Sequence, residues 1–149
     1  ARENNGGKDV VAGDPSSAGY IFPVEGLNIY NINRRYYPSY PGHTGVDINI
    51  NVRNKRVIAA KAGTVVISAA QRRADGSYRS YGEYVVINHH DGTMTLYGHM
   101  SPDSRAVSKG DEVVQVLGIV GTTGNSTGLH LHFEVRVNGR CVNPLPYLQ

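Results

Sequence analysis

The chain has 149 residues, of which 40% are hydrophobic and 18% charged, a composition that suits one domain with its own core and no need of disulfides. Lysine and arginine outnumber the acids by 15 to 12 but are scattered along the chain, which argues against a nucleic-acid-binding protein. No apolar run approaches the length that crosses a bilayer, so we expect no integral membrane segment, and the single cysteine, Cys141, cannot form an internal disulfide.

Residues 1–18 are rich in glycine, asparagine, serine and charge, and we expect them to form a linker or a flexible arm. The chain does not begin with methionine, which is typical of a trimmed mature form or an excised domain. We expect the compact domain to span residues 19–149. It opens with an expected edge strand at residues 20–24, which stops at Pro23, and continues with a proline-containing loop at residues 31–42.

The next segments are short and apolar, and turn residues separate them. Residues 45–52 alternate, with Val46, Ile48, Ile50 and Val52 on the face that we expect to be buried. We expect further strands at residues 57–60, 64–70, 84–88, 93–97 and 113–120, and a polar loop at residues 71–82. The Asp91-Gly92 pair predicts a tight hairpin. No segment has a sustained helical period, so the sequence predicts one mainly β, antiparallel domain.

The strand pattern is clearest after Gly128, where apolar and polar residues alternate. Leu131 and Phe133 would face a core, whereas His130, His132 and Glu134 would point the other way. Packing rarely requires two histidines on the same face of a strand. We therefore predict that one of the two binds a metal ion and that the other acts on the substrate.

A second pair of candidate ligands lies in residues 42–47 (GHTGVD). His43 and Asp47 are four residues apart, so in an extended strand their side chains leave on the same face. With His132 they would complete the three protein ligands of a catalytic zinc site, which leaves a fourth position for water or substrate. Taken alone, a loop histidine and a solvated aspartate explain the pair equally well.

His99 follows a predicted strand, on the side expected for Thr95 and Tyr97. A lone histidine at the end of a strand is more often a surface residue than a catalyst. His89 and His90 stand beside the Asp-Gly turn, and we interpret them as turn residues.

The order of these motifs along the chain is more informative than any one of them. They are residues 42–47 (GHTGVD), 97–99 (YGH) and 130–132 (HLH), accompanied by residues 62–66 (AGTVV), 84–89 (YVVINH) and 118–128 (GIVGTTGNSTG). In this order the chain, from about Gly19 to its end, resembles the lysostaphin-like (LytM-type) zinc endopeptidases of peptidoglycan. One departure is Leu129, where many members of that family carry proline before the first histidine of the pair.

The resemblance implies a small, mainly antiparallel β-sheet domain with a groove-like active site between loops. It implies one zinc ion (Zn2+) held by His43, Asp47 and His132, and it makes His99 and His130 the two catalytic histidines. Their division of the acid and base work is left open.

A tyrosine hydroxyl near the metal would stabilise the oxyanion. In this family such a tyrosine often comes from the loop before the first ligand. Tyr37 is therefore our first candidate, with Tyr36 and Tyr40 as alternatives.

The implied function is zinc-dependent hydrolysis of peptide bonds in bacterial peptidoglycan, in a stem peptide or a cross-bridge, by metal-activated water with histidine assistance. The expected partners are peptidoglycan peptides, and the expected location is extracytoplasmic in bacteria. No ligand or catalytic position of the family is missing, whereas relatives that only bind or regulate have typically lost some of them.

Three other functions stay open. The same ligand types form the iron site of non-haem Fe(II) oxygenases. Residues 63–66 and 109–113 share the pattern of lipoyl and biotinyl carriers, although the turn at residues 90–92 offers no lysine to modify. Finally, the domain could bind zinc and serve as a non-catalytic cell-wall receptor or scaffold. The sequence determines neither the oligomeric state nor the peptide bond that is cleaved.

Overall fold

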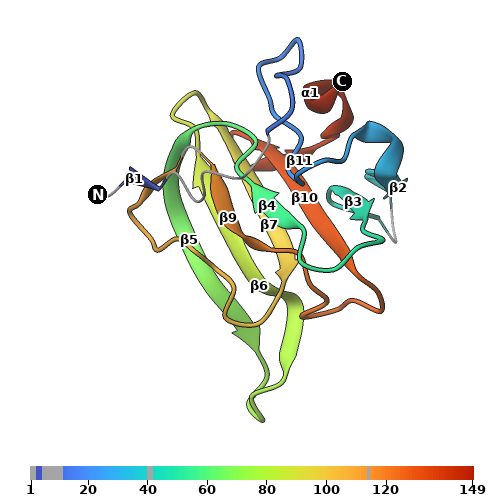
Figure 1. The fold of residues 1–149 in the computed structure, drawn as a ribbon, viewed down its shortest axis with the longest axis vertical. Coiled ribbons are helices and arrows are strands. Elements are labelled where there is room, and N and C mark those ends of the chain that lie inside the picture. Colours follow the sequence, from blue (N-terminus) through green and yellow to red (C-terminus); the bar gives the residue numbers. More distant parts are fainter. Residues whose placement is uncertain (1–2, 5–11, 40–41, 114) are drawn as a thin grey trace.

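The computed structural model describes residues 3–4, 12–39, 42–113 and 115–149, which form one large sheet and one small sheet (Figure 1). The large sheet has the strand order β1-β8-β5-β6-β7-β10-β3-β2, and β11 pairs with β10 outside this path. The small sheet pairs β4 with β9. All pairings are antiparallel except that of β1 with β8. The prediction of a mainly β, antiparallel fold is confirmed.

The elements have the following bounds. The strands are β1 (Glu3–Asn4), β2 (Ile32–Arg34), β3 (Val46–Asn49), β4 (Arg56–Ile58), β5 (Gly63–Arg72), β6 (Tyr78–Asn88), β7 (Thr93–Met100), β8 (Glu112–Val113), β9 (Val116–Ile119), β10 (His130–Val137) and β11 (Arg140–Val142). The helices are η1 (Ile29–Asn31) and α1 (Leu145–Leu148). No helix in the described ranges is long and apolar enough to cross a membrane.

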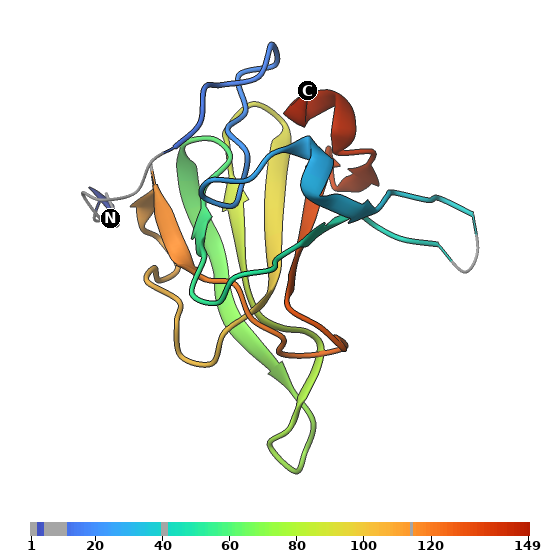
Figure 2. The ribbon, with the colours of Figure 1, turned by 45° about the vertical axis from the view of Figure 1, so that its right-hand side comes forward.

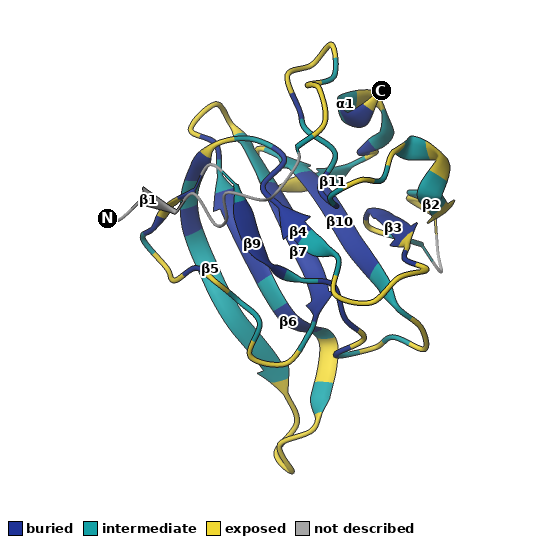
Figure 3. Ribbon diagram, in the orientation of Figure 1, coloured by how far each residue is buried: buried dark blue, intermediate teal, exposed yellow. Residues whose placement is uncertain are grey.

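The core lies between the small sheet and one face of the large sheet. Leu131 and Phe133 of β10 are fully buried there, with Val57 of β4 and Leu117 of β9 in the same apolar cluster. Figure 3 shows the buried middle of the large sheet and the exposed end of the β5–β6 hairpin. Because side chains of a strand alternate between faces, burying these residues directs His130 and His132 to the opposite face.

The hairpin between β6 and β7 forms as predicted, around the turn that contains Asp91 and Gly92. The predicted polar loop at residues 71–82 is wrong, because β5 and β6 continue through it and only residues 73–77 connect them. This part of the hairpin projects beyond the body of the domain (Figure 2). Solvent reaches both of its faces, so its polar residues carry no alternation that would identify a strand.

Other predicted elements also needed correction. Residues 20–24 form no strand, although Val24 makes an isolated bridge with Val57. The predicted loop at residues 31–42 contains β2, which pairs with β3. Val52 is 55% exposed, since β3 ends at Asn49 before the alternation does. The division of the chain at residue 19 stays a prediction.

The prediction for the face of His99 is wrong for a backbone reason. His99 has a positive φ of 62°, which interrupts the alternation of β7. Tyr97 and Met100 therefore both belong to the core, while the ring of His99 lies 6.0 Å from that of His132 on the opposite face. His89 was also misinterpreted, since it is only 7% exposed and therefore buried rather than a surface turn residue.

Candidate metal centre and groove

Three predicted ligands converge at one point of the large sheet. His132 of β10 and Asp47 of β3 are direct partners in the antiparallel ladder, and His43 precedes β3 by three residues. The ligand atoms of these three residues all lie within 4.8 Å of one another. Asp47 Oδ1 is 2.9 Å from His132 Nδ1 and 3.1 Å from His43 Nε2. Ligands of a tetrahedral zinc ion with bonds of about 2.0 Å are separated by about 3.3 Å, so the spacing fits such an ion.

The other nitrogen of each histidine already has a partner outside the centre. His43 Nδ1 donates to the carbonyl oxygen of Arg35 at 2.9 Å, and His132 Nε2 donates to Glu134 Oε2 at 2.9 Å. In the neutral imidazoles these bonds leave the lone pairs of His43 Nε2 and His132 Nδ1 directed at the same carboxylate oxygen of Asp47. Three lone-pair donors that face one another repel unless a proton or a cation lies between them. A single divalent cation satisfies all three, so the donor set fits zinc.

Glu134 fixes the orientation of His132 by accepting the hydrogen bond from its Nε2, and the sequence had indicated no role for Glu134 in the site. Its side chain is fully buried, and its Oε2 accepts hydrogen bonds from Thr44 at 2.6 Å and from Tyr81 at 2.5 Å. Arg136 forms an ion pair with Oε1 at 2.8 Å. Burial alone would raise the pKa of Glu134, but these donors and His132 lower it to about 2. The carboxylate is therefore ionised and fully satisfied.

The charges around His132 also favour a cation. Burial opposes protonation of its ring, but the carboxylates of Asp47 and Glu134 raise its pKa. Burial likewise opposes ionisation of Asp47, and the bond and charge of His132 nevertheless lower the pKa of that carboxyl. Two carboxylates thus flank one imidazole, and their negative charge favours binding of a cation at the centre.

The two predicted catalytic histidines lie beside the ligands, with ring centroids 4.8 Å apart. His99 Nδ1 donates to the carbonyl oxygen of Thr123 at 2.7 Å, and burial lowers the pKa of His99 to about 4. His99 is therefore neutral at pH 7, with its lone pair on Nε2. His130 Nδ1 donates to the carbonyl oxygen of Gly128 at 2.9 Å, and its Nε2 lies 3.8 Å from Asp47 Oδ1. Both rings thus keep Nε2 free for proton transfer.

All five histidine and aspartate candidates line one cavity of about 690 Å³. Other lining residues come from separate elements and are mostly polar: Asn33, Arg34, Thr44, Asn49, Ser80, Tyr81, Asn125, Ser126 and Thr127. An open cavity with polar walls can bind the amide groups of an extended peptide.

The tyrosine candidates lie elsewhere. Tyr37 is 56% exposed, pairs with His43 through the backbone, and lines a neighbouring cavity of about 420 Å³ rather than the cavity of the five candidates. The hydroxyl of Tyr36 donates to the carbonyl oxygen of Cys141 at 3.3 Å. Tyr40 lies outside the described residues. The tyrosine that stacks on His132, with ring centroids 5.6 Å apart, is Tyr81. It falls in the segment predicted to be a loop, so no pattern in the sequence pointed to it.

A glycine between the first two ligands allows the close approach of β3 and β10. A Cβ atom built on Gly45 would lie 2.1 Å from the carbonyl oxygen of Phe133, closer than any real contact. Only glycine can therefore hold His43 and Asp47 against the strand that carries His132.

Comparisons with known proteins agree with this geometry. A sequence model described as Peptidase family M23 matches residues 41–144 of the chain. The chain is 42% identical over 107 residues to a protein of Neisseria meningitidis serogroup B named DD-carboxypeptidase/endopeptidase Mpg, covering 69% of this chain and 22% of that protein. It is 34% identical over 136 residues to the murein hydrolase activator NlpD of Salmonella dublin, covering 90% of this chain and 32% of NlpD. The chain thus spans less than half of the length of either relative.

A solved structure gives the same result for the fold. The catalytic domain of lysostaphin, an antimicrobial peptidase from Staphylococcus simulans, superposes with a TM-score of 0.61 at 29% sequence identity. The match covers 80% of this chain and 89% of that domain. The predicted lysostaphin-like fold is thereby confirmed.

Proposed function

The chain belongs to peptidase family M23, and we propose that it is a zinc-dependent endopeptidase that hydrolyses peptide bonds in bacterial peptidoglycan. The names of its relatives support a role in peptidoglycan hydrolysis, either as a hydrolase or as an activator of one. The observation that carries the enzymatic proposal is the convergence of His43, Asp47 and His132, with a neutral histidine beside them.

The proposed site residues divide into ligands and proton carriers. His43 Nε2, Asp47 Oδ1 and His132 Nδ1 would hold the zinc ion, because these three atoms converge and the other ring nitrogen of each histidine is already bonded outside the centre. When bound, zinc supplies a Lewis acid that polarises a peptide carbonyl and lowers the pKa of water to roughly 7. The proton transfers are carried out by side chains of the protein.

The proton transfers belong to His99 and His130. The neutral Nε2 of His99 accepts a proton from the attacking water, and the bond of its Nδ1 to Thr123 keeps the ring in that tautomer. His130, whose ring lies 4.8 Å from that of His99 and whose Nε2 is 3.8 Å from Asp47 Oδ1, shares with His99 the return of a proton to the leaving amine. Tyr37 remains our proposed donor to the oxyanion, and its exposed ring beside His43 is consistent with a hydroxyl that approaches a bound peptide.

Peptidoglycan as the substrate implies an extracytoplasmic location in bacteria, because that polymer lies outside the cytoplasmic membrane. The name of NlpD supports a second candidate, a non-catalytic activator of murein hydrolases. Against it stands the complete set of ligands and the two adjoining histidines. An activator needs a peptidoglycan-binding surface but no proton carrier beside a metal.

The test uses purified protein and isolated cell-wall sacculi. We expect zinc-loaded protein to release new amino groups, chelation to abolish the release, and added zinc to restore it. Full release by a metal-free preparation would contradict the proposal. Protein that releases nothing alone but accelerates a separately purified murein hydrolase would establish the activator instead.

A further inference from the structure

A bulge between β2 and β3 places an arginine beside the metal centre. Ile32 pairs with Ile48, but the next pair is Arg34 with Asp47, so β2 contains one extra residue. In a regular ladder Arg34 would pair with Val46, which is fully buried in the core. The bulge moves Arg34 onto the opposite face, directly across from a predicted metal ligand. Bulges are frequent next to active sites, where they change the direction of a side chain.

Arg34 therefore lines the cavity that contains the five candidate site residues. Among the described residues that line this cavity, it is the only lysine or arginine, and Asp47 is the only carboxylate. Directly opposed residues of an antiparallel pair have Cβ atoms about 5 Å apart, within reach of an arginine side chain.

Asp47 nevertheless forms no ion pair with Arg34. Among the described residues, the ion-pair partners of Asp47 are His43, His130 and His132. Within the described ranges of the chain, no carboxylate lies at ion-pair distance from the exposed Arg34 guanidinium. A cation in the wall of the groove is thus left without an acidic partner among the residues that the structure describes.

We propose that Arg34 is a specificity-determining residue, whose guanidinium binds a free carboxylate of the peptide beside the metal centre. This inference rests on the proposed function, since it assigns the substrate class of the same site. A guanidinium presents paired N–H donors that match the two oxygens of a carboxylate, and neutral amides match them poorly. The groove therefore favours stem peptides, which carry free carboxylates, over a neutral glycine cross-bridge.

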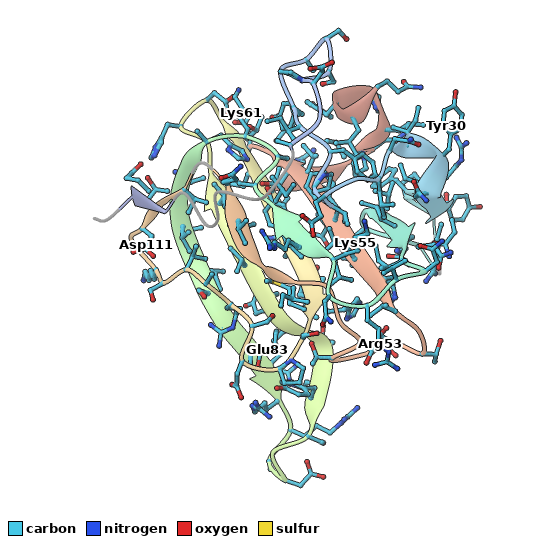
Figure 4. All side chains as sticks on the ribbon, viewed as in Figure 1. Tyr30, Arg53, Lys55, Lys61, Glu83 and Asp111 are labelled. Atoms are coloured by element: carbon cyan, nitrogen blue, oxygen red, sulfur yellow. The ribbon has the colours of Figure 1, made fainter. Side chains whose placement is uncertain are left out.

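The experiment measures the affinity of the zinc-loaded protein for purified stem peptides by NMR titration. Four forms of the peptide are compared. One has all carboxylates free, one has only the terminal carboxylate amidated, one has only the side-chain carboxylates amidated, and one has every carboxylate amidated. Pentaglycine amide represents the neutral cross-bridge. Mass spectrometry of the same samples records whether any peptide is cleaved. Protein variants are Arg34→Gln, Arg34→Lys and Arg53→Gln, the last being an exposed arginine outside the cavity that projects from the loop after β3 (Figure 4).

We expect the free-acid peptide to bind about tenfold more tightly than the fully amidated one, which corresponds to about 1.4 kcal/mol. In Arg34→Gln this ratio should fall to about one, with the loss in binding rather than in turnover. Arg34→Lys should keep part of it, and Arg53→Gln should keep all of it. The singly amidated form that loses the preference identifies the carboxylate as terminal or side-chain.

Several results would overturn the inference. These are equal binding of acid and amide forms by the natural protein, an undiminished preference in Arg34→Gln, an equal loss in Arg53→Gln, or no measurable binding of the free-acid peptide. Cleavage without an acid preference would refute the inference and leave the proposed function intact. A preference for the acid form without any cleavage would support the inference about Arg34 and contradict the proposed enzymatic function.

Discussion

At the scale of single residues, the centre depends on what stands behind each ligand. His132 connects two carboxylates, with Asp47 on Nδ1 and Glu134 on Nε2. A carboxylate behind a ligating histidine fixes its tautomer and increases its basicity as a ligand. Glu134 is suited to this role because it is fully buried yet kept ionised by Thr44, Tyr81 and Arg136.

We therefore predict that Glu134→Gln weakens zinc binding by about 10- to 100-fold, although Glu134 is not itself a proposed ligand. The amide preserves the shape of the side chain but removes the charge that orients His132. Competition with a chromogenic chelator measures the affinity. The matched control is Glu112→Gln, an exposed carboxylate on β8 that contacts Thr64 instead. An unchanged affinity in Glu134→Gln would mean that the tautomer of His132 is fixed by something else.

At the scale of elements, a buried network of hydrogen bonds connects the β6–β7 hairpin to the segment before β5. His89 Nδ1 donates to the carbonyl oxygen of Ala62, and its Nε2 accepts from the hydroxyl of Thr95, each at 2.9 Å. Thr95 in turn accepts from Tyr97, whose oxygen accepts from the backbone N–H of Ala60. Every donor and acceptor in this network has a partner only when His89 is neutral.

This network makes part of the stability depend on pH. Burial lowers the pKa of His89 below the value of about 6.5 that it has in the unfolded chain, while the charge of Asp91 opposes the shift and those of Lys61 and His90 add to it. The unfolded chain therefore binds the proton first. The stabilisation is complete above about pH 6.5 and is lost as the pH falls toward the folded pKa, by up to about 1.4 kcal/mol per pH unit.

Urea unfolding of metal-free protein between pH 5 and pH 7.5 measures this dependence. The natural protein should lose more free energy of unfolding on acidification than His89→Asn, which starts less stable. The pH responses of the remaining histidines cancel in this comparison. Parallel curves for the two proteins would show that protonation of His89 is not the cause.

At the scale of the whole molecule, the proposed ligands connect parts that are distant in the sequence. Asp47 and His132 are separated by 85 positions and meet only because β3 pairs with β10. The unfolded chain offers no such site, so binding of zinc should stabilise the fold.

We predict that zinc at 100 times its Kd stabilises the domain by about 2.7 kcal/mol and raises the Tm by about 5 to 10 °C. Calorimetric scans with and without zinc measure the increment. It should disappear in His43→Ala, which loses a proposed ligand, and persist in His99→Ala, which loses a proposed proton carrier. Loss of the increment in His99→Ala would assign that histidine to the metal instead.

Much of the fold was predictable because alternation is a local property. The pattern after Gly128 identified which residues of β10 are buried, and Asp91-Gly92 identified the hairpin. The ends of β5 and β6 at residues 71–72 and 78–82 escaped prediction as strands, because solvent on both faces removes the alternation. Tyr81 was missed with them, since its contact with Glu134 spans 53 positions.

By itself the sequence determined the residue types of the proposed metal ligands and the polar face of β10. The order of its motifs also identified the family. Those properties depend on residue identity and near neighbours. Only the tertiary structure decided the directions of His99 and Arg34 and the buried environment of His89. The first two depend on a positive φ in β7 and on an extra residue in β2, which strand pairing across the sheet imposes. A two-residue period cannot express either irregularity, because each one shifts that period.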